Sequence, residues 1–247
     1  MSKSRQIQYS AEALATPFDP PEPAADAISS KLWDACQKIA TDALESKFMQ
    51  GLGDGTLDPT IYGQYTVQDC AYCAAAADDY KDLEAAAKKA NEPGLASLAK
   101  EHYTSYESWV IKTYLPSWHI GNPNALVLNQ AAKEYINHER AAVTASHPIY
   151  AMVAQIACER LWPWLAEQLK PASPAHNVYA FWISDNYDYK KSYVLSNTID
   201  QWFKSNSDQY DHDTALWALQ GSMTGELNLF LSACGQPIVP MPKLPNA

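Results

Sequence analysis

Three side chains, two acidic and one thiol, stand in sequence surroundings that could support catalysis. The first is Asp69 in YTVQDCAYC, with Tyr65 four residues before it and Tyr72 three residues after it. Residues at these spacings share one face of a helix. A carboxylate on an aromatic face can accept two hydrogen bonds from an amino-substituted heterocycle. It can also be a buried acid bonded to a neighbouring helix, and spacing alone leaves both interpretations open.

The thiol is Cys158, in the segment QIACERLWPWL. Trp162 follows one helical turn later, and Pro163 then removes a backbone hydrogen bond and usually kinks a helix. A thiol is a nucleophile only as thiolate, so its site must lower a pKa that is ordinarily about 8.5. Without such a site, a buried cysteine is simply a small apolar residue.

The second acid is Glu226, in the segment SMTGELNLFL. Its neighbours are small or apolar, so a buried position would raise the pKa of this carboxyl. A carboxyl with a raised pKa can donate a proton in catalysis. The alternative is a solvated charge on the outer face of the helix.

Other patterns of reactive residues are incomplete. Cys70 and Cys73 form a CxxC pair, but no second pair or paired histidine motif supplies four zinc ligands, and we interpret both as core thiols. No Glu-x-x-His occurs, and a di-iron site in a helical bundle of the ferritin type requires two. The segment GLGDGT fits neither a phosphate-binding loop nor a dinucleotide fingerprint. We therefore expect no metal and no organic cofactor.

Proline, glycine and capping residues divide the chain into pieces of helical length. We expect helices over about 26–50, 58–91, 93–115, 124–146, 147–170, 176–205 and 211–235, with GLGDGTLDP as a loop after the first. The sixth piece has a possible break at Asp185. Residues 1–25 are predicted to be an extended or disordered arm, and residues 236–247 a proline-rich tail that is not helical. The intervening 26–235 then form one all-α domain of antiparallel helices.

Composition narrows the class of protein further. Of the 247 residues 47% are hydrophobic, which is enough for a sizeable core. The net charge of −10 argues against binding to a phosphate backbone. No apolar run reaches the 18 residues of a membrane span, and the first residues lack the apolar stretch of a secretion signal. With five cysteines, an odd number, we expect reduced thiols and a cytoplasmic location.

Taken together, these features resemble the TenA/thiaminase II family, which has a haem-oxygenase-like all-α fold. The resemblance spans about residues 30–235. Its most specific part is FMQGLGDGTL at 48–57, followed by Tyr65, then the pair Gln68 and Asp69, then Tyr72. In this family the aspartate holds the amino group and a ring nitrogen of an aminopyrimidine, which implies that role for Asp69. Tyr72 matches the nearby pocket tyrosine.

The later site residues of the family also have matches in this chain. Cys158 matches the nucleophilic cysteine, although Ala157 replaces the proline that usually precedes it. Tyr135 matches the pocket tyrosine upstream of that cysteine. Glu226, with Phe230 four residues on, matches the catalytic glutamate and the aromatic residue that follows it.

Besides Ala157, the chain departs from the family pattern at two further places. Trp162 stands one turn after the cysteine, where the family usually has a tyrosine. The family's Trp-Ile-x-x-Tyr motif occurs as Trp182 to Tyr187 and is one residue longer. Either Asn186 replaces the pocket tyrosine, or Tyr187 fills its place through a shifted helix.

The resemblance implies a hydrolase of the thiaminase II type, acting at the exocyclic methylene of a 4-amino-2-methylpyrimidine. In that reaction Asp69 binds the amidine edge, Cys158 adds to the ring and Glu226 moves protons. The expected pocket residues are Tyr65, Tyr72, Tyr135, Trp162, Asn186 and Tyr187.

Two other functions stay open on the sequence. One is a pocket protein that binds a small amine or heterocycle without turnover, and the other is a related enzyme with a different amine substrate. A haem or di-iron oxygenase is less favoured because the ligand spacing is missing. The expected partner is a small-molecule pyrimidine, with neither nucleic acid nor membrane, and the resemblance implies a homotetramer.

Overall fold

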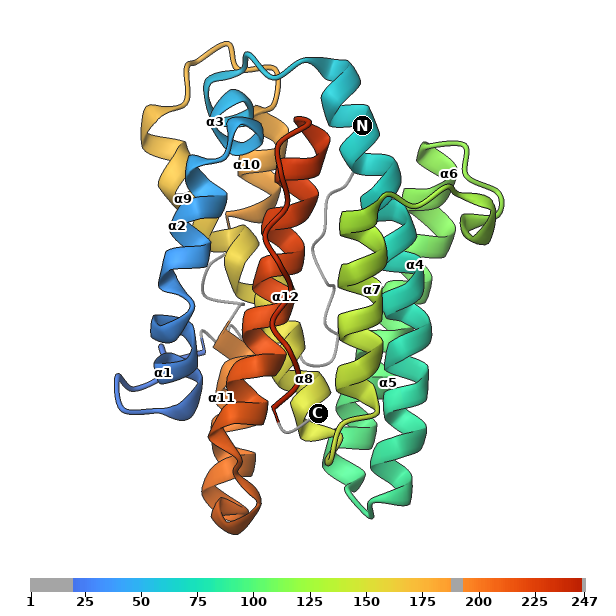
Figure 1. Cartoon of the computed structure of the whole chain (residues 1–247), viewed down its shortest axis with the longest axis vertical. Coiled ribbons are helices and arrows are strands. Elements are labelled where there is room, and N and C mark those ends of the chain that lie inside the picture. The colour runs from blue at the N-terminus through green and yellow to red at the C-terminus, as the bar shows by residue number, and fades with distance from the viewer. Residues whose placement is uncertain (1–19, 188–192, 246–247) are drawn as a thin grey trace.

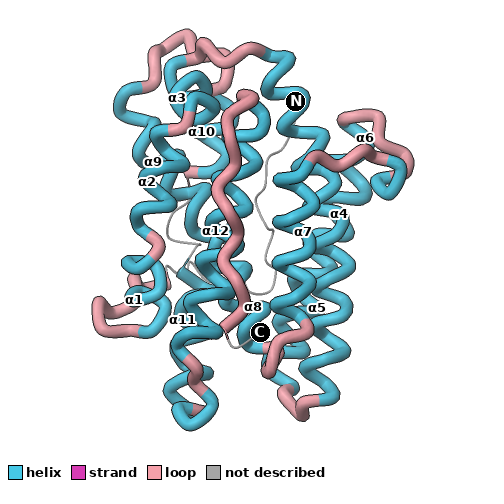
Figure 2. The backbone as a smooth tube through the Cα atoms, viewed as in Figure 1, coloured by secondary structure: helices cyan, strands magenta, loops and turns pink. Residues whose placement is uncertain are grey.

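The computed structural model of the chain describes residues 20–187 and 193–245. Within these ranges the regular structure is helical, and the helices lie side by side in an elongated bundle (Figure 1, Figure 2). This confirms the predicted all-α, single-domain fold. The α-helices are α1 (Ile28–Ala35), α2 (Gln37–Glu45), α3 (Lys47–Asp54), α4 (Pro59–Lys89), α5 (Pro93–Tyr106), α6 (Leu115–Ser117), α7 (Gln130–Val143), α8 (Ile149–Ile156), α9 (Trp162–Leu169), α10 (Ala180–Asn186), α11 (Tyr193–Ser205) and α12 (His212–Ala233).

Helix α4 begins and ends at the residues that its sequence signals indicate. The Asp58 side chain accepts a 2.7 Å hydrogen bond from the Thr60 N–H, and Pro59 occupies the first turn, where its missing N–H costs nothing. Lys88 and Lys89 stand in the last turn, where cations interact favourably with the helix dipole. The helix predicted over 58–91 is thus confirmed. Helices α5 and α7 pack against it (Figure 1).

Helix α12 lies in the middle of the view and contacts α2, α7 and α8 (Figure 1). The Asp211 side chain caps its start by accepting a 2.7 Å hydrogen bond from the Thr214 N–H. The chain then turns back and runs along α12 as the loop segment visible in Figure 2. Two backbone bonds to the Asn228 amide, at 2.7 and 2.8 Å, hold Val239 there. Residues 236–245 form no helix, as predicted for this part of the tail.

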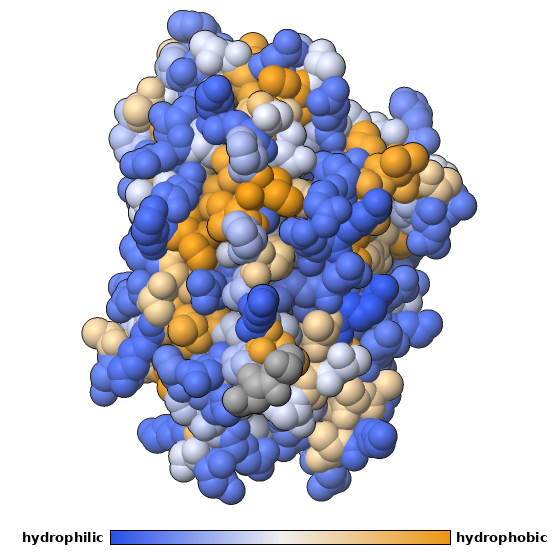
Figure 3. Space-filling view, viewed as in Figure 1, coloured by the Kyte–Doolittle hydropathy of each residue, from blue (hydrophilic) through white to orange (hydrophobic). Residues whose placement is uncertain are grey.

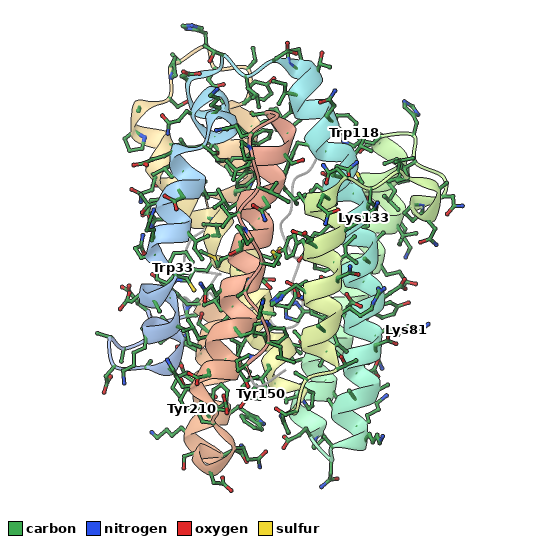
Figure 4. The ribbon with its side chains drawn as sticks, in the orientation of Figure 1. Trp33, Lys81, Trp118, Lys133, Tyr150 and Tyr210 are labelled. Atoms are coloured by element: carbon green, nitrogen blue, oxygen red, sulfur yellow. The ribbon has the colours of Figure 1, made fainter. Side chains whose placement is uncertain are left out.

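Tyr150 ties α8 to the connection between α11 and α12. Its hydroxyl donates to the Gln209 carbonyl at 2.9 Å and accepts from the Asp211 N–H at 2.9 Å. Tyr210 lies beside it at the lower end of the molecule (Figure 4). The start of α12 is therefore fixed relative to α8, the helix that leads to Cys158.

Two π-helical segments each lie just before a proline within a helical run. Segment η1 (Glu107–Tyr114) precedes Pro116, and η3 (Ala157–Leu161) precedes Pro163. Proline cannot donate to the carbonyl four residues earlier, and its ring crowds that carbonyl. Wider π-type turns accommodate the lost bond, and such segments are frequent at functional sites. Cys158 lies within η3.

The helix predicted over 26–50 is instead three short helices, with breaks at Cys36 and Ser46. The third of them, α3, continues to Asp54, so the loop predicted from Gly51 begins only at Gly55. Gly55 has a φ of 82°, which side chains rarely adopt, and it ends the helix in the left-handed conformation. Gly51 and Gly53 instead stand within α3.

The predicted N-terminal arm lies largely outside the described residues, which begin at Pro20. Where the chain is first described, the Pro21 carbonyl accepts a 2.9 Å hydrogen bond from the Asn197 amide on α11. Figure 3 shows hydrophilic residues over most of one face, with hydrophobic ones gathered in its upper half. Of the helices in the described part of the chain, none has the length and apolar character to cross a bilayer.

Candidate active site

Asp69 lies on the buried side of α4 and is 2% exposed. The Tyr114 hydroxyl, at the end of η1, donates a 2.8 Å hydrogen bond to its Oδ2. Burial, and secondly the charge of Asp69, raises the pKa of Tyr114 well above its ordinary value, so the phenol stays a donor. A carboxylate offers about four acceptor positions, so this bond is compatible with an amidine edge binding to the same group.

Tyr72 and Tyr135 form a stacked pair between α4 and α7. Their ring centroids are 4.1 Å apart with an interplanar angle of 15°. The Tyr135 hydroxyl donates a 3.1 Å hydrogen bond to Glu226 Oε1 on α12. Burial raises the pKa of both phenols well above the ordinary value, and nearby negative charge adds to the effect. The tyrosine pair thus joins the helix of Asp69 to the helix of Glu226.

Glu226 is fully buried, at 0% exposure. The alternative of a solvated charge on an outer helix face is therefore wrong. Its helix approaches α7 closely because Gly225 has no side chain. A Cβ atom at position 225 would lie 2.4 Å from Tyr135 Cδ2, closer than real Cβ contacts. Gly225 therefore allows the Tyr135 ring to lie flat against α12 with its hydroxyl at the glutamate.

Cys158 lies in η3 and is 7% exposed. Its Sγ is 3.5 Å from the Tyr106 hydroxyl, and either atom can be the donor. Negative charge on Cys158 contributes to the raised pKa of both Tyr72 and Tyr135. The thiol, the stacked tyrosines and Glu226 therefore belong to one electrostatic cluster in the core.

Aromatic rings enclose the end of this cluster nearest Tyr65. The Trp162 ring lies 6.4 Å from Tyr65 and 5.2 Å from Trp182, between centroids. Tyr65 in turn lies 5.6 Å from Phe230, the aromatic residue that follows Glu226 by one turn. All four side chains are buried. Trp162 and Tyr65 therefore lie together, as expected of walls of one pocket.

The lengthened motif on α10 places its two candidate residues differently. Asn186 is buried at 6% exposure, and its amide donates to the Trp182 carbonyl of its own helix at 2.8 Å. Tyr187 is 39% exposed, and the Lys170 ammonium lies 3.2 Å from its ring centroid. Tyr187 therefore lies apart from the buried cluster.

Two tyrosines of the cluster were not predicted from the sequence. Tyr106 immediately precedes η1 and Tyr114 is its last residue. They reach Cys158 and Asp69, which are distant in the sequence. The only local signal is Pro116, which marks the irregular helix but not its partner. In the described part of the chain, no group of three or more His, Cys, Asp or Glu residues is placed to hold a metal ion.

No protein-family model matches the sequence, and no curated protein sequence matches it significantly. Solved structures do match. A TenA homologue from P. horikoshii OT3 superposes with a TM-score of 0.67 and 18% identity, over 84% of this chain and 98% of that one. The chain has the TenA fold. A TenA family transcription regulator from Silicibacter sp. TM1040 gives a TM-score of 0.69 and 13% identity, over 83% of this chain and 96% of that one. A putative TenA-like thiaminase from Sulfolobus solfataricus P2 gives a TM-score of 0.59 and 15% identity, over 85% of this chain and 98% of that one.

The fold implied by the sequence resemblance is thus confirmed at identities too low to carry an activity across. Within this TenA fold, α4, α7, η3 and α12 bring Asp69, Tyr135, Cys158 and Glu226 into the core of one bundle.

Proposed function

We propose that this chain is a hydrolase of the thiaminase II type that acts on a 4-amino-2-methylpyrimidine. One observation carries the proposal. Asp69, Cys158 and Glu226 come from three separate helical segments, and all three are buried. Cys158 and Glu226 lie near the stacked Tyr72 and Tyr135, and Asp69 stands one turn before Tyr72 on α4. The sequence singled out the three side chains for different chemistry, namely heterocycle binding, nucleophilic attack and proton transfer. The TenA fold, shared with a putative TenA-like thiaminase, supports this assignment.

The proposed reaction assigns one role to each side chain. Asp69, oriented by Tyr114, accepts hydrogen bonds from the amino group and a protonated ring nitrogen, an arrangement strengthened by charge. The Cys158 thiolate adds to the electron-poor ring, and electrons returning through the ring expel the amine from the exocyclic methylene. Glu226 gives the leaving amine its proton.

The second half of the reaction restores the enzyme. Water adds to the methylene carbon and gives a proton to Glu226, the carbon–sulfur bond breaks, and the hydroxymethyl product leaves. The Tyr135 hydroxyl holds Oε1 of Glu226 throughout. Trp162 and Tyr65 form the aromatic wall. No metal or organic cofactor takes part in these steps.

The direct test incubates the purified protein with 4-amino-5-aminomethyl-2-methylpyrimidine or with thiamin. Ammonia, or the thiazole, and the hydroxymethyl product are followed by mass spectrometry. The proposal expects turnover that Cys158→Ala abolishes. Tight binding without product would support the pocket protein instead. Absence of both binding and turnover would point to a different amine substrate, and a panel of amines would then follow.

A further inference from the structure

A second buried carboxyl lies one helical turn below the proposed site. Glu139, on α7, follows Tyr135 by one turn and is 2% exposed. Its Oε1 accepts a 2.5 Å hydrogen bond from the Ser222 hydroxyl, and its Oε2 accepts a 2.5 Å hydrogen bond from the Gln155 amide. The proposed reaction gives this carboxyl no chemical role.

One partner of Glu139 stands on the helix that carries Glu226, and the other stands near the end of α8, which continues directly into η3 and Cys158. Ser222 lies on α12, four residues before Glu226. Gln155 lies on α8, three residues before Cys158. One carboxyl therefore holds the Cys158 segment with one oxygen and the Glu226 helix with the other. Its own helix supplies Tyr135, which binds Glu226 directly.

The connection continues to α4 and is enclosed throughout. The side-chain oxygen of Gln155, Oε1, accepts a 2.9 Å hydrogen bond from the Tyr80 hydroxyl on α4. Gln155, Tyr80 and Ser222 are exposed by 4%, 2% and 0%. At such depth the loss of the Glu139 carboxyl leaves buried polar groups of Ser222 and Gln155 without a partner, which is costly.

The charges facing Glu139 are predominantly negative. Asp79 on α4 and Glu226 on α12 both raise the pKa of Glu139, after burial itself, while the Ser222 bond lowers it; the pKa reaches about 8. Arg140 binds Asp79 through its Nε at 3.1 Å. The titratable groups around Glu139 and its partners are Tyr72, Asp79 and Tyr80 on α4, His102 on α5, Tyr135 and Arg140 on α7, and Glu226 on α12.

We propose that Glu139 is a positioning residue, whose carboxyl fixes the separation and orientation of Cys158 and Glu226 by binding Gln155 and Ser222 at once. This inference rests on the proposed hydrolysis. It has an electrostatic consequence as well. Near neutral pH Glu139 is uncharged, and as the pH rises through about 8 it adds a negative charge near Glu226.

The test compares two substitutions of Glu139 with a matched control. In Glu139→Gln the amide oxygen accepts from Gln155, and the amide nitrogen donates to the Ser222 oxygen, which reverses the direction of that bond, so both contacts persist without a charge. In Glu139→Leu both bonds are lost. The control is His138→Asn, which removes a different contact between α7 and α12, the 2.9 Å bond of the His138 ring to the Ala218 carbonyl.

For aminomethylpyrimidine hydrolysis, we expect Glu139→Leu to lower kcat at least tenfold with KM changed less than threefold. Glu139→Gln should keep kcat at pH 7 within about threefold and remove an inflection near pH 8 from the wild-type pH profile. His138→Asn should lower Tm without changing kcat more than about twofold. If Glu139→Leu does not fold, Ser222→Ala tests the loss of one bond, and it should lower kcat by about threefold or more.

A second measurement separates this inference from the proposed function. Alkylation of Cys158 by iodoacetamide, followed by peptide mass spectrometry, needs no turnover. We expect Glu139→Leu or Ser222→Ala to change its rate at least fivefold, with Glu139→Gln and His138→Asn close to wild type at pH 7. If the wild type is inactive but shows this labelling pattern, the proposed hydrolysis is refuted and the positioning role of Glu139 is retained. If Glu139→Leu and Ser222→Ala are labelled at the same rate as His138→Asn, the positioning role of Glu139 is overturned, whatever the activity.

Discussion

Tyr114 binds Asp69 from the last residue of a π-helical segment, at 2.8 Å. The bond joins two side chains that the local sequence does not relate. It presents the carboxylate in one orientation on the aromatic face of α4. Burial keeps the phenol protonated, because it raises the Tyr114 pKa well above the ordinary value. The pair thus provides a fixed acceptor, which suits recognition of a planar amidine.

The first prediction concerns this pair. Asp69→Asn should weaken binding of an aminopyrimidine roughly ten- to hundredfold, because a hydrogen bond to a charged group is worth about 1.5–3 kcal/mol. Tyr114→Phe keeps the charge of Asp69 and removes only the hydrogen bond that orients the carboxylate. It should therefore weaken binding by up to about tenfold. Isothermal titration calorimetry measures both. Tyr103→Phe is the control, since that hydroxyl bonds to Glu107 on its own helical run. An unchanged dissociation constant in Asp69→Asn would remove Asp69 from the pocket.

The second prediction is that Cys158 is the cysteine required for turnover. Cys158→Ser should lower kcat by several powers of ten and leave binding nearly intact. Cys73→Ser should change the rate less than about tenfold, although Cys73 shares the helix face of Asp69. Burial raises the pKa of Cys36 to about 12, which keeps that thiol unreactive. Loss of activity in Cys73→Ser with retention in Cys158→Ser would place the nucleophile in the CAYC segment.

The third prediction concerns the close approach of α7 and α12. A Cβ atom at Gly221 would lie 2.1 Å from His138 Cε1, and one at Gly225 would lie 2.4 Å from the Tyr135 ring. Substitution of either glycine by alanine should therefore destabilise the fold by about 1–3 kcal/mol, as overpacking does. Gly225→Ala should in addition lower turnover, because the Tyr135 ring must move. Urea unfolding monitored by circular dichroism gives the stabilities.

Gly94→Ala is the matched control for these variants. Gly94 lies in the first turn of α5, and a Cβ atom there would meet nothing within 4 Å. The substitution should leave stability unchanged or raise it by up to about 1 kcal/mol, since alanine restricts the unfolded chain. Equal stability of Gly94→Ala and Gly225→Ala would contradict the close approach.

Local signals predicted those parts of the fold that local physics determines. The Asp58-Pro59 start of α4 and the Asp211 start of α12 are capping signals, and both helices form there. The break at Ser46 has a capping signal that the prediction does not use, since the Ser46 hydroxyl accepts a 3.2 Å hydrogen bond from the Met49 N–H. The break at Cys36 has no side-chain cap to mark it in the sequence. The left-handed turn at Gly55 was missed because GLGDGT has three glycines and only one adopts that conformation.

The candidate site divides in the same way. Asp69, Cys158 and Glu226 stand out by residue type and neighbours, and the resemblance relates them to one another. Tyr114 and Glu139 do not stand out in the sequence, because their importance depends on contacts with distant helices. A glutamate within EYINHERAA looks like an ordinary surface charge. Only the closeness of α7 to α8 and α12 makes Glu139 a buried acid.

The fourth prediction is self-association. The low charged fraction, 19%, and the family resemblance both favour an oligomer. The structure adds exposed aliphatic side chains, with Val127 89% and Val178 69% exposed. An assembly would cover such surface in its interfaces. Light scattering should give a mass that is a multiple of 27.4 kDa, fourfold for a tetramer. A stable monomer at micromolar concentration would contradict the prediction.

The last prediction concerns how stability depends on pH through Glu139. Its pKa is about 8 in the folded protein, chiefly because of burial, against an ordinary value of 4.5. Between these values the folded state holds a proton that the unfolded state has lost. The free energy of unfolding therefore falls as pH rises from about 4.5 to 8, by at most about 1.4 kcal/mol per pH unit. Glu139→Gln has no proton to lose and removes this slope.

The Tm of Glu139→Gln minus that of wild type should therefore increase from pH 5 to pH 8 and level off above it. Burial also lowers the pKa of His102 to about 4, which destabilises the fold as pH falls below 6.5, but this contribution is common to both proteins and cancels in the difference. Glu134→Gln, on the same helix and not buried, is the control and should follow the wild type. Scanning calorimetry at pH 5, 6.5, 8 and 9 measures the difference. A Tm difference that does not vary with pH would mean that Glu139 is ionised in the folded protein at neutral pH. Glu139 would then bind Gln155 and Ser222 as a charged carboxylate during turnover.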